Sequence, residues 1–457
     1  MNRVTKRTWI MALFLLVLVA GMVFFLWEYA TKAGDWVTFQ GSPHIYNSGN
    51  IGCGTIVDRS GNVLLDITDD RNYASDEATR RSTLHWLGDR KGFISAGAIS
   101  HYGAEMAGFD LVNGIYDASG TGGRADLTLS SQVQNTALRS LNGRKGTVAV
   151  YNYKTGQILC AVTSPTYDPD NVPDISADAT GKYEGVYLSR FLQSTYIPGS
   201  IFKVVTTAVA LETVKDIEQR RFQCTGILEY GSEKVSCESV HGTQTLRTAL
   251  ANSCNCAFAQ IAELIGKKTM VEYVEKFGIT DSLSFDGVTT AEGNYDVSGA
   301  APVSFAWSCI GQYTDQINPA RYMTFMGAIG GNGSAAKPHL MERITVGNNQ
   351  TYQAKTEKMA RILSEDTAQK LKEYMRGNTT AVYGDWNFPG LNVCAKSGTS
   401  QQGGEKASNA MFAGFVADEE YPLAFIVVVE GGGYGSSTCV PILSRVLDTC
   451  KAVLDGR

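Results

Sequence analysis

The hydrophobic pattern is strongest near the N-terminus, where Trp9–Trp27 contains no charged residue. At a rise of 1.5 Å per residue, a helix of this length crosses a hydrocarbon core of roughly 30 Å. Three basic residues precede it (Arg3, Lys6 and Arg7). Because basic residues are retained on the cytoplasmic side, the N-terminus is predicted to lie inside and the chain after Tyr29 outside, as in a single-pass protein of the cell membrane. The alternative is a cleaved signal peptide, but its apolar region would be unusually long and no small-x-small cleavage site follows it.

Residues 34–123 alternate short apolar runs with Gly, Asp, Asn and Ser. Gly54–Leu65 has the pattern of a strand, a turn at Ser60–Asn62 and a second strand. The glycine-rich stretch Ser119–Gly123 marks a boundary. The chain is therefore divided into a cytoplasmic tail (residues 1–8), a transmembrane anchor (9–29), a β-rich N-terminal domain (34–123) and a larger domain (124–457).

The larger domain shows both strand and helix periodicity. Its predicted elements are a strand entering a helix (Asp126–Leu141), a hairpin (Gly146–Tyr153 and Gln157–Thr163), helices over Pro198–Val214, Thr248–Ile265, Ser364–Gly377 and Ser436–Leu454, and strands over Leu391–Thr399, Asn409–Ala417 and Leu423–Glu430. Strands at both ends of a helical middle indicate one sheet that is completed by distant segments. The predicted fold class is therefore α+β.

The composition excludes some classes of protein and of partner but assigns no function. The chain has 457 residues, of which 44% are hydrophobic and 19% charged, so it is globular rather than disordered. The formal net charge is −5. A mildly acidic protein has no general attraction for nucleic acid or anionic lipid, so neither is an expected partner on charge grounds.

The ten cysteines are notable in a chain predicted to lie outside the membrane, where disulfides form. Only Cys224 and Cys237 have the spacing of a local loop closure, and we predict that they pair. Four others sit in apolar segments and are interpreted as small buried residues (Cys254, Cys256, Cys309 and Cys394). No Cys/His cluster has metal-ligand spacing and only five histidines are available, so no metal site is expected.

The first candidate for chemistry is Ser200, in the sequence Pro198–Lys203. Proline is favoured at a helix start, where free backbone N–H groups also stabilise developing negative charge. Lys203 follows three residues later on the same face, within reach of the Ser200 hydroxyl. It can act as the base only if burial and nearby positive charge lower its pKa. Ser334–Lys337 has the same Ser-x-x-Lys spacing, but it lies in a glycine-rich loop without a helix start.

The second candidate is Ser253 with Asn255. The tripeptide Ser-x-Asn also occurs at Ser48, Ser60 and Ser140, and its simplest interpretation is a turn that interrupts a helix. Only Ser253 lies in an apolar helical segment about fifty residues after Ser200.

The third candidate is Lys396 with Ser397, Gly398 and Thr399, at the end of a predicted strand. A glycine there lets a ligand or another backbone approach closely, as in an edge strand that binds a peptide by β-augmentation. The matching Lys154–Gly156 is ordinary turn chemistry between the two strands of the first hairpin.

Ser-x-x-Lys, Ser-x-Asn and Lys-Ser/Thr-Gly, in this order, resemble the signature of penicillin-binding proteins and serine β-lactamases. Flanking sequence narrows the resemblance to class B penicillin-binding proteins, strongly over residues 124–440 and loosely over 45–115. The segments that carry it are Leu127–Ser130 with Gln134, Lys154–Leu159, Ser164–Pro169, Tyr196–Ser200, Asn252–Asn255, Ile310–Gln312 and Asn332–Gly333, and Gly54–Gly61 is similar to the start of that family's pedestal domain. The departures are Ser189 and Ile201, where Asn and Thr are common.

The resemblance implies an α/β/α sandwich, in which helices cover an antiparallel sheet, with a smaller β-rich pedestal, or dimerisation-like, domain and one membrane helix. It implies a serine D,D-transpeptidase, without a cofactor or metal, that cross-links the D-Ala-D-Ala stem peptides of peptidoglycan and is acylated by β-lactam antibiotics. The implied roles are nucleophile for Ser200, base for Lys203, an oxyanion hole from the N–H groups of Ser200 and Thr399, proton transfer for Ser253 assisted by Lys203 and Lys396, amide orientation for Asn255, and carboxylate binding for Lys396, Ser397 and Thr399.

Three alternatives share the motifs: a β-lactamase, a β-lactam-sensing domain, and a catalytically silent scaffold of the wall-synthesis machinery. No Glu-x-x-Leu-Asn sequence lies between Ser253 and Lys396, so the water-activating glutamate of one β-lactamase class has no evident counterpart. β-Lactam sensors carry several membrane spans, whereas a single membrane segment is predicted here. All three motifs are intact, which argues against a silent scaffold. The segment before residue 124 is too short for a glycosyltransferase, so the resemblance implies a separate membrane glycosyltransferase as partner. Septation, elongation and sporulation remain equally compatible with the sequence.

Overall fold

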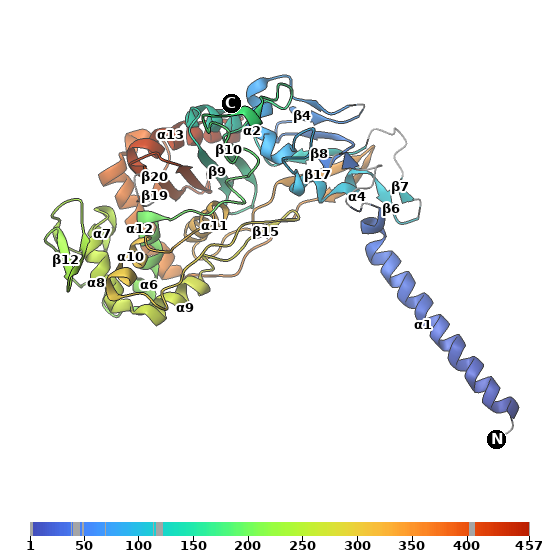
Figure 1. The fold of residues 1–457 in the computed structure, drawn as a ribbon, viewed down its shortest axis with the longest axis horizontal. Coiled ribbons are helices and arrows are strands. Elements are labelled where there is room, and N and C mark those ends of the chain that lie inside the picture. Colours follow the sequence, from blue (N-terminus) through green and yellow to red (C-terminus); the bar gives the residue numbers. More distant parts are fainter. Residues whose placement is uncertain are drawn as a thin grey trace.

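The computed structural model describes residues 3–37, 39, 46–47, 50–68, 70–112, 114–115, 122–401 and 407–456. Helix α1 (Arg3–Val37) projects away from the rest of the protein, and its apolar side chains are exposed (Figure 1). Among the described residues it is the one helix long and apolar enough to cross a membrane, with a mean hydropathy of 2.8 over its most apolar window. The helix extends beyond the predicted segment at both ends, and an ion pair of 3.0 Å between Glu28 and Lys32 supports its last turns.

The part of the protein next to α1 contains a six-stranded sheet in the order β18-β17-β8-β3-β4-β5. Its strands are β3 (Thr55–Val57), β4 (Val63–Asp66), β5 (Asn72–Tyr73), β8 (Arg124–Leu127), β17 (Met341–Val346) and β18 (Asn349–Gln353). The predicted strand-turn-strand at Gly54–Leu65 is confirmed as β3 and β4, and Asp58 closes the turn by accepting from the N–H groups of Ser60 and Asn62 at 2.9 Å each. Because β8, β17 and β18 follow residue 123, this sheet extends across the predicted domain boundary.

Short elements complete this region. They are β1 (Tyr46–Asn47), β2 (Asn50–Ile51), α2 (Glu77–Leu87), α3 (Gly97–Ser100), α4 (Gly103–Met106), β6 (Phe109–Asp110) and β7 (Gly114–Ile115). Helix α2 begins where the Asp76 carboxylate accepts from the Thr79 N–H at 2.9 Å.

The larger region is built on a five-stranded antiparallel sheet in the order β10-β9-β21-β20-β19. Its strands are β9 (Gly146–Asn152), β10 (Ile158–Ser164), β19 (Val393–Ser400), β20 (Asn409–Val416) and β21 (Leu423–Val429). The first hairpin therefore pairs with strands that lie far along the chain, as the pattern predicted. Every residue of β20 and β21 is buried, as expected for central strands covered on both faces.

Two helical layers cover this sheet (Figure 1). Val148 and Val150 of β9 face α5 (Ser131–Leu141) and α13 (Gly435–Leu454), whereas Ala149 and Tyr151 face α11 (Pro319–Gly330). Alternation of side chains along a strand puts successive residues in different cores. The predicted α/β/α sandwich is confirmed.

The helical middle lies on the α11 side and extends away from α1 (Figure 1). Its elements are η2 (Gly199–Phe202), α6 (Lys203–Thr213), α7 (Leu246–Ala251), α8 (Asn255–Ile265), α9 (Lys267–Lys276), α10 (Pro302–Ile310) and α12 (Glu365–Asn378), with the small strands β11 (Phe222–Cys224), β12 (Ile227–Tyr230), β13 (Glu233–Ser236) and β14 (Gly242–Gln244). Other short elements lie elsewhere: η3 (Thr379–Tyr383) and η4 (Asp385–Asn387) pack on the α13 side, η1 (Ile175–Ala177) packs near α2, and β15 (Ser284–Phe285) and β16 (Val288–Thr289) lie next to the six-stranded sheet.

Two predicted helices are corrected by the structure. The continuous helix predicted over Thr248–Ile265 is broken, because Ser253 has a φ of 52° and separates α7 from α8. The helix predicted from Pro198 begins with the single 3₁₀ turn η2, which leads directly into α6. Ser253 at the break and Ser200 in the η2 turn are both candidates for chemistry from the sequence.

The predicted Cys224–Cys237 disulfide is not present, since the structure has both residues as thiols. The Cys224 sulfur lies 3.5 Å from the Nδ1 atom of His241. The Cys237 sulfur lies 3.8 Å from the sulfur of Cys254. Cys224 and Cys237 are thus close to His241 and Cys254, respectively. The prediction from spacing did not consider either of these neighbours.

A buried ion pair ties the segment before Ser200 to the end of the central sheet. The Arg190 Nε atom donates to the Glu430 carboxylate at 2.8 Å, and the Tyr196 hydroxyl donates to the same oxygen at 2.9 Å. The Arg190 side chain is only 7% exposed, whereas that of Glu430 is 29% exposed. Removing the carboxylate would therefore leave a guanidinium buried without its charged partner.

We expect Glu430→Ala to lower the free energy of unfolding by about 2 kcal/mol, less than a fully buried pair would cost because Glu430 is partly exposed. Thermal unfolding of the full chain in detergent, followed by circular dichroism, measures the change. Glu419→Ala is the matched control, because its partner Lys154 lies in an exposed turn and the pair should contribute little. Equal stability of the Glu430 variant and the parent would contradict the structural role.

Candidate active site

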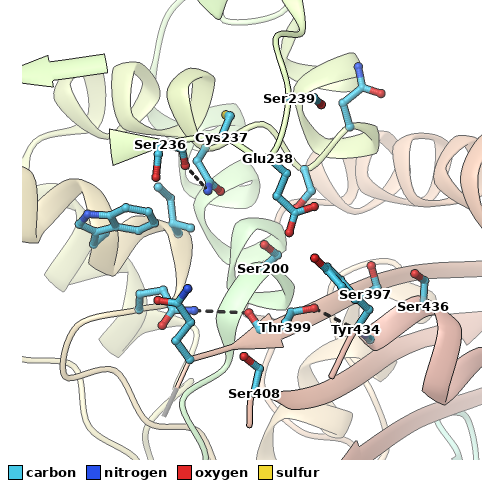
Figure 2. Close-up of a pocket in the computed structure, with 18 of the residues that line it drawn as sticks. Ser200, Ser236, Cys237, Glu238, Ser239, Ser397, Thr399, Ser408, Tyr434 and Ser436 are labelled. Carbon is cyan, nitrogen blue, oxygen red and sulfur yellow. Dashed lines mark hydrogen bonds between the residues drawn. The ribbon is translucent and has the colours of Figure 1, made fainter. Parts of the chain in front are cut away.

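The three sequence motifs meet in one open cleft with a volume of about 890 Å³ between the edge strand β19 and the helical middle (Figure 2). Its lining includes Ser200 from η2, Ser253 and Asn255 from the break between α7 and α8, and Ser397 and Thr399 from β19. The fold thus brings together residues that are far apart in the sequence.

Ser200 lies in the turn that starts α6, which packs directly against β19. A Cβ atom on Gly199, whose φ is +56°, would lie 2.5 Å from the Thr399 carbonyl oxygen. A Cβ atom on Gly398 would lie 2.8 Å from the Pro198 carbonyl oxygen. Both glycines are therefore required for close approach of two backbones. The sequence left open whether Gly398 admits a ligand or another backbone. In the structure a backbone approaches it, namely that of the Ser200 turn.

Lys203 is completely buried beside the cleft and held by three oxygens. Its Nζ atom donates to the Ser253 carbonyl at 2.6 Å, to the Ser253 hydroxyl at 3.1 Å and to the Asn255 Oδ1 atom at 2.7 Å. Burial, followed by the positive charge of Lys396, lowers the pKa of Lys203 to about 7. A large fraction is therefore neutral at physiological pH and can accept a proton.

The Lys203 hydrogen bonds found among the described residues connect this lysine to the Ser-x-Asn motif. The sequence had placed Lys203 within reach of the Ser200 hydroxyl, and the two residues lie on adjoining turns of η2 and α6. The Ser253 hydroxyl, which contacts the Lys203 amine, lines the same cleft as Ser200.

Lys396 approaches the same hydroxyl from the opposite element. Its Nζ atom lies 3.2 Å from the Ser253 Oγ atom and donates to the Ser397 carbonyl at 3.0 Å. Burial lowers the pKa of Lys396 to about 7 as well. The Ser253 hydroxyl therefore lies between two amines that each titrate near neutrality, an arrangement suited to passing a proton in either direction.

The positive φ of Ser253 is part of this geometry. A non-glycine residue in the left-handed region stores strain of order 1–3 kcal/mol, which the surrounding structure must hold. Here the Lys203 amine binds both the carbonyl and the hydroxyl of Ser253. The conformation that sequence propensity disfavours is thus the one that presents the hydroxyl to both lysines.

Strand β19 is an edge strand, as predicted, but much of its free edge is covered. Asn378 donates to the Ala395 carbonyl at 3.2 Å, and the Ser397 N–H donates to the Tyr383 hydroxyl at 2.8 Å. The Thr399 carbonyl faces the same outer side, where Gln312 donates to it at 3.4 Å. In an antiparallel strand the N–H and carbonyl of one residue point the same way, so the Thr399 N–H also faces the cleft.

Three of the residues around the cleft were not assigned a role from sequence. Tyr383 covers the Ser397 edge, Gln312 contacts Thr399, and Glu238 points toward the centre of the cleft near Ser200 (Figure 2). The negative charge of Glu238 opposes the lowered pKa of both lysines. No spacing rule marks Tyr383 or Glu238, whereas Gln312 was within a segment that resembled the family.

The competing motifs lie elsewhere. Lys154 pairs with Glu419 in the turn between β9 and β10. Lys337, which ends the second Ser-x-x-Lys sequence, pairs with Glu357 at 3.3 Å. Neither of these lysines lines the cleft.

Comparison with known families agrees with this arrangement. Residues 146–448 match the family described as the penicillin-binding protein transpeptidase domain. The matched segment includes all of the candidate residues, from Ser200 to Thr399.

Among curated proteins, stage V sporulation protein D of Bacillus subtilis is 26% identical to this chain over 346 residues. The aligned segment covers 70% of this chain and 52% of that protein. It is 28% identical over 338 residues to the peptidoglycan D,D-transpeptidase PbpA of Mycolicibacterium smegmatis, covering 68% of each. The chain therefore spans about half the length of the first relative and about two thirds of the second.

Among solved structures, the D,D-transpeptidase domain of a peptidoglycan glycosyltransferase from Eggerthella lenta is similar with a TM-score of 0.75 and 26% identity, over 88% of this chain and 98% of that one. The penicillin G acyl-enzyme complex of penicillin-binding protein A from M. tuberculosis has a TM-score of 0.72 and 21% identity, over 88% and 99% of the two chains. At 21% identity, the similarity to the M. tuberculosis structure establishes the fold alone.

The buried lysines predict a pH dependence that can be measured with a serine-acylating reagent such as a fluorescent penicillin. Below its pKa, Lys203 is protonated and accepts no proton, so acylation should be slow. The rate should rise as the pH increases through about 7 and level off above it. In Lys396→Met the neighbouring positive charge is gone, so the pKa of Lys203 should rise and the midpoint should move to higher pH. A flat profile in the parent, or an unchanged midpoint in the variant, would contradict this electrostatic account.

Proposed function

Because this chain belongs to the penicillin-binding protein transpeptidase family, we propose that it is a membrane-anchored class B peptidoglycan D,D-transpeptidase with Ser200 as its nucleophile. The observation that carries this proposal is the convergence of the Lys203 and Lys396 amines on the Ser253 hydroxyl, beside the Ser200 turn. This geometry supplies an activated serine and a proton route in one cleft.

The substrate is the D-Ala-D-Ala end of a stem peptide, which lies along the part of β19 that remains accessible at Thr399. A peptide bound there extends the sheet by one strand, since the outward N–H and carbonyl of an edge strand are free to pair. Ser397, Thr399 and the Lys396 amine bind the terminal carboxylate, and Asn255 orients the peptide amide. Gly398 contributes by letting the Ser200 turn lie against the strand.

Acylation begins when the Ser200 Oγ atom attacks the penultimate carbonyl carbon. The hydroxyl proton passes to the neutral Lys203 amine, directly or through Ser253, and the oxyanion is stabilised by the N–H groups of Ser200 and Thr399. The tetrahedral intermediate then collapses, the peptide bond breaks, and Ser253 delivers a proton to the departing D-alanine. An ester now joins the stem peptide to Ser200.

The second half-reaction transfers the acyl group. The amine of a neighbouring stem peptide attacks the ester carbonyl and gives up a proton through Ser253 to the lysines. The ester C–O bond then breaks, Lys203 returns a proton to the Ser200 Oγ atom, and the new peptide bond is the cross-link. The base of the first step becomes the acid of the second, as the two lysine pKa values near 7 allow. β-Lactams are acylating inhibitors of the same serine, because they present a comparable carbonyl and carboxylate.

The location of the enzyme follows from α1. The basic residues before the apolar segment keep the N-terminus in the cytoplasm, so the cleft lies outside the membrane. The six-stranded sheet, which includes β8, β17 and β18, forms the pedestal between anchor and catalytic sheet. A separate membrane glycosyltransferase supplies the glycan strands.

Ser200→Ala should abolish covalent labelling by a fluorescent penicillin while the circular dichroism spectrum stays unchanged, because no other group attacks the β-lactam carbonyl. Labelling is read on denaturing gels of the full chain in detergent. Ser334→Ala, in the competing Ser-x-x-Lys sequence, is the matched control and should label like the parent. Residual label in Ser200→Ala would contradict the assignment of the nucleophile.

The time course distinguishes a transpeptidase from a β-lactamase and from a silent scaffold. Label that persists supports a transpeptidase, whose acyl-enzyme excludes water. Label that appears and then disappears with turnover indicates a β-lactamase. A correctly folded parent that takes no label indicates a silent scaffold.

Ser253→Ala tests the proton route. Loss of the shared hydroxyl should slow acylation by about 100-fold or more, the range of general acid–base catalysis, while Ser200 remains able to react. Ser60→Ala, in another Ser-x-Asn sequence, is the control and should leave the rate unchanged. An acylation rate close to that of the parent would exclude Ser253 from the route.

A further inference from the structure

A second cluster of reactive side chains lies beside the cleft and has no part in the reaction just described. It consists of Cys224 at the end of β11, Cys237 after β13, His241 before β14, and Cys254 at the start of α8. One sulfur or nitrogen atom from each lies within 4.8 Å of the other three. Four side chains from four segments thus converge on one point.

The distances within the cluster fit a tetrahedron around one metal ion. Zinc binds cysteine sulfur at about 2.3 Å and histidine nitrogen at about 2.0–2.1 Å, so tetrahedral angles put two sulfurs ~3.8 Å apart and a sulfur and a nitrogen ~3.5 Å apart. The Cys237 and Cys254 sulfurs are separated by 3.8 Å. The Cys224 sulfur and the His241 Nδ1 atom are separated by 3.5 Å.

The surroundings are those that metal-bound thiolates and imidazoles require. The Cys256 N–H donates to the Cys237 sulfur at 3.2 Å, and the Ala257 N–H donates to the Cys254 sulfur at 3.4 Å. On the other side of the imidazole, the Nε2 atom of His241 lies 3.2 Å from the Ser239 hydroxyl. That hydrogen bond leaves Nδ1 to face the sulfurs.

We propose that Cys224, Cys237, His241 and Cys254 bind one Zn²⁺ ion in a closed structural site. A set of three sulfurs and one nitrogen favours a soft or borderline ion with tetrahedral preference over Mg²⁺ or Ca²⁺, which take oxygen ligands. Four protein ligands leave no open position for water or substrate, as in structural zinc sites. Binding releases the three thiol protons to solvent, since the thiolate is the ligand.

The sequence pointed only weakly to this site, because Cys237 and His241 are its one local pair, with three residues between them. Twelve residues separate Cys224 from Cys237 and another twelve separate His241 from Cys254. The β11–β14 pairing and the β12–β13 hairpin bring the first three together, and the break before α8 brings the fourth. The predicted disulfide used two of these four ligands, and the expectation of no metal site relied on local spacing and on the small number of histidines.

The site holds the strained part of the active site in place. Cys254 lies between Ser253 and Asn255, and the Asn255 amide donates to the Ser236 carbonyl at 2.8 Å, next to Cys237. The loop from Cys237 to His241 carries Glu238 into the cleft. A metal ion would therefore fix the Ser-x-Asn motif and one wall of the cleft together. This consequence for acylation rests on the proposed function, whereas metal binding does not.

The test uses the full chain in detergent, prepared free of metal under reducing conditions and then exchanged into buffer with Zn²⁺. Mass spectrometry of the metal content should find one zinc ion per chain after removal of the excess. Substitution with Co²⁺ should give the intense visible absorption of a tetrahedral thiolate complex, which identifies the ligand set without any measurement of activity.

Cys224→Ser and His241→Gln should each weaken zinc binding on the order of 100-fold or more, since removal of a ligand exceeds the effect of losing an outer-shell partner. Cys53→Ser is the matched control and should keep one zinc per chain. Cys256→Ser is a closer control, because this thiol lies next to the cluster but outside the four ligands.

Three results would overturn the proposal: a folded parent that takes up no zinc or cobalt, full zinc binding in both ligand variants, or a Cys224–Cys237 disulfide in the untreated chain detected by alkylation and intact mass. Labelling by penicillin separates this proposal from the proposed function. A chain that binds zinc but takes no label contradicts only the transpeptidase assignment, and a chain that labels without binding zinc contradicts only the metal site.

Discussion

The burial of Lys203 is the physical constraint on which the rest of the site depends. Removing an ammonium group from water costs several kcal/mol, and the protein meets that cost by favouring the neutral amine. The second buried amine, Lys396, adds like-charge repulsion. An exposed lysine at position 203 would remain protonated at neutral pH and could accept no proton. In the proposed mechanism, the hydrophobic packing around α6 therefore also prepares the base.

That burial is assembled by long-range packing. Helix α6 supplies Lys203, strand β19 supplies Lys396, and the α7–α8 break supplies the hydroxyl between them. These elements can approach one another because glycine occurs where backbones meet. A Cβ atom on Gly311 would lie 2.1 Å from the Gly199 carbonyl oxygen, and one on Gly435 would lie 2.2 Å from the Gly398 carbonyl oxygen. The positions of the reactive groups are thus determined by backbone contacts as well as by side chains.

Sequence patterns predicted the local elements well, because each rests on neighbouring residues. The membrane helix, the β9–β10 hairpin and the final helix all follow from periodicity or turn chemistry. The helix predicted from Ser364 is confirmed as α12, and the Ser364 hydroxyl caps it by accepting from the Thr367 N–H at 3.1 Å. The three motifs also proved to lie in one cleft, which their order in the chain had indicated.

Features that depend on tertiary contacts could not be predicted in this way. The stretch around Ser253 has good helix propensity, and only its packing against Lys203 explains why the helix breaks there. The cover that Tyr383 gives to β19 comes from a turn that has no strand pattern. Spacing shows only Cys237 and His241 of the cysteine and histidine cluster, because strand pairing brings in Cys224 and the break before α8 brings in Cys254.

The six-stranded sheet has a consequence for the order of events in biogenesis. Four of its six strands precede the five-stranded sheet in the chain, but β17 and β18 come from beyond residue 340. Strand β17, which pairs with β8, is therefore synthesised some two hundred residues after β8 itself. In the proposed membrane orientation, one edge of β8 stays unpaired during export until that late segment arrives, and an exposed edge invites association with other chains. The six-stranded sheet next to α1 can therefore be completed only after most of the chain has been exported.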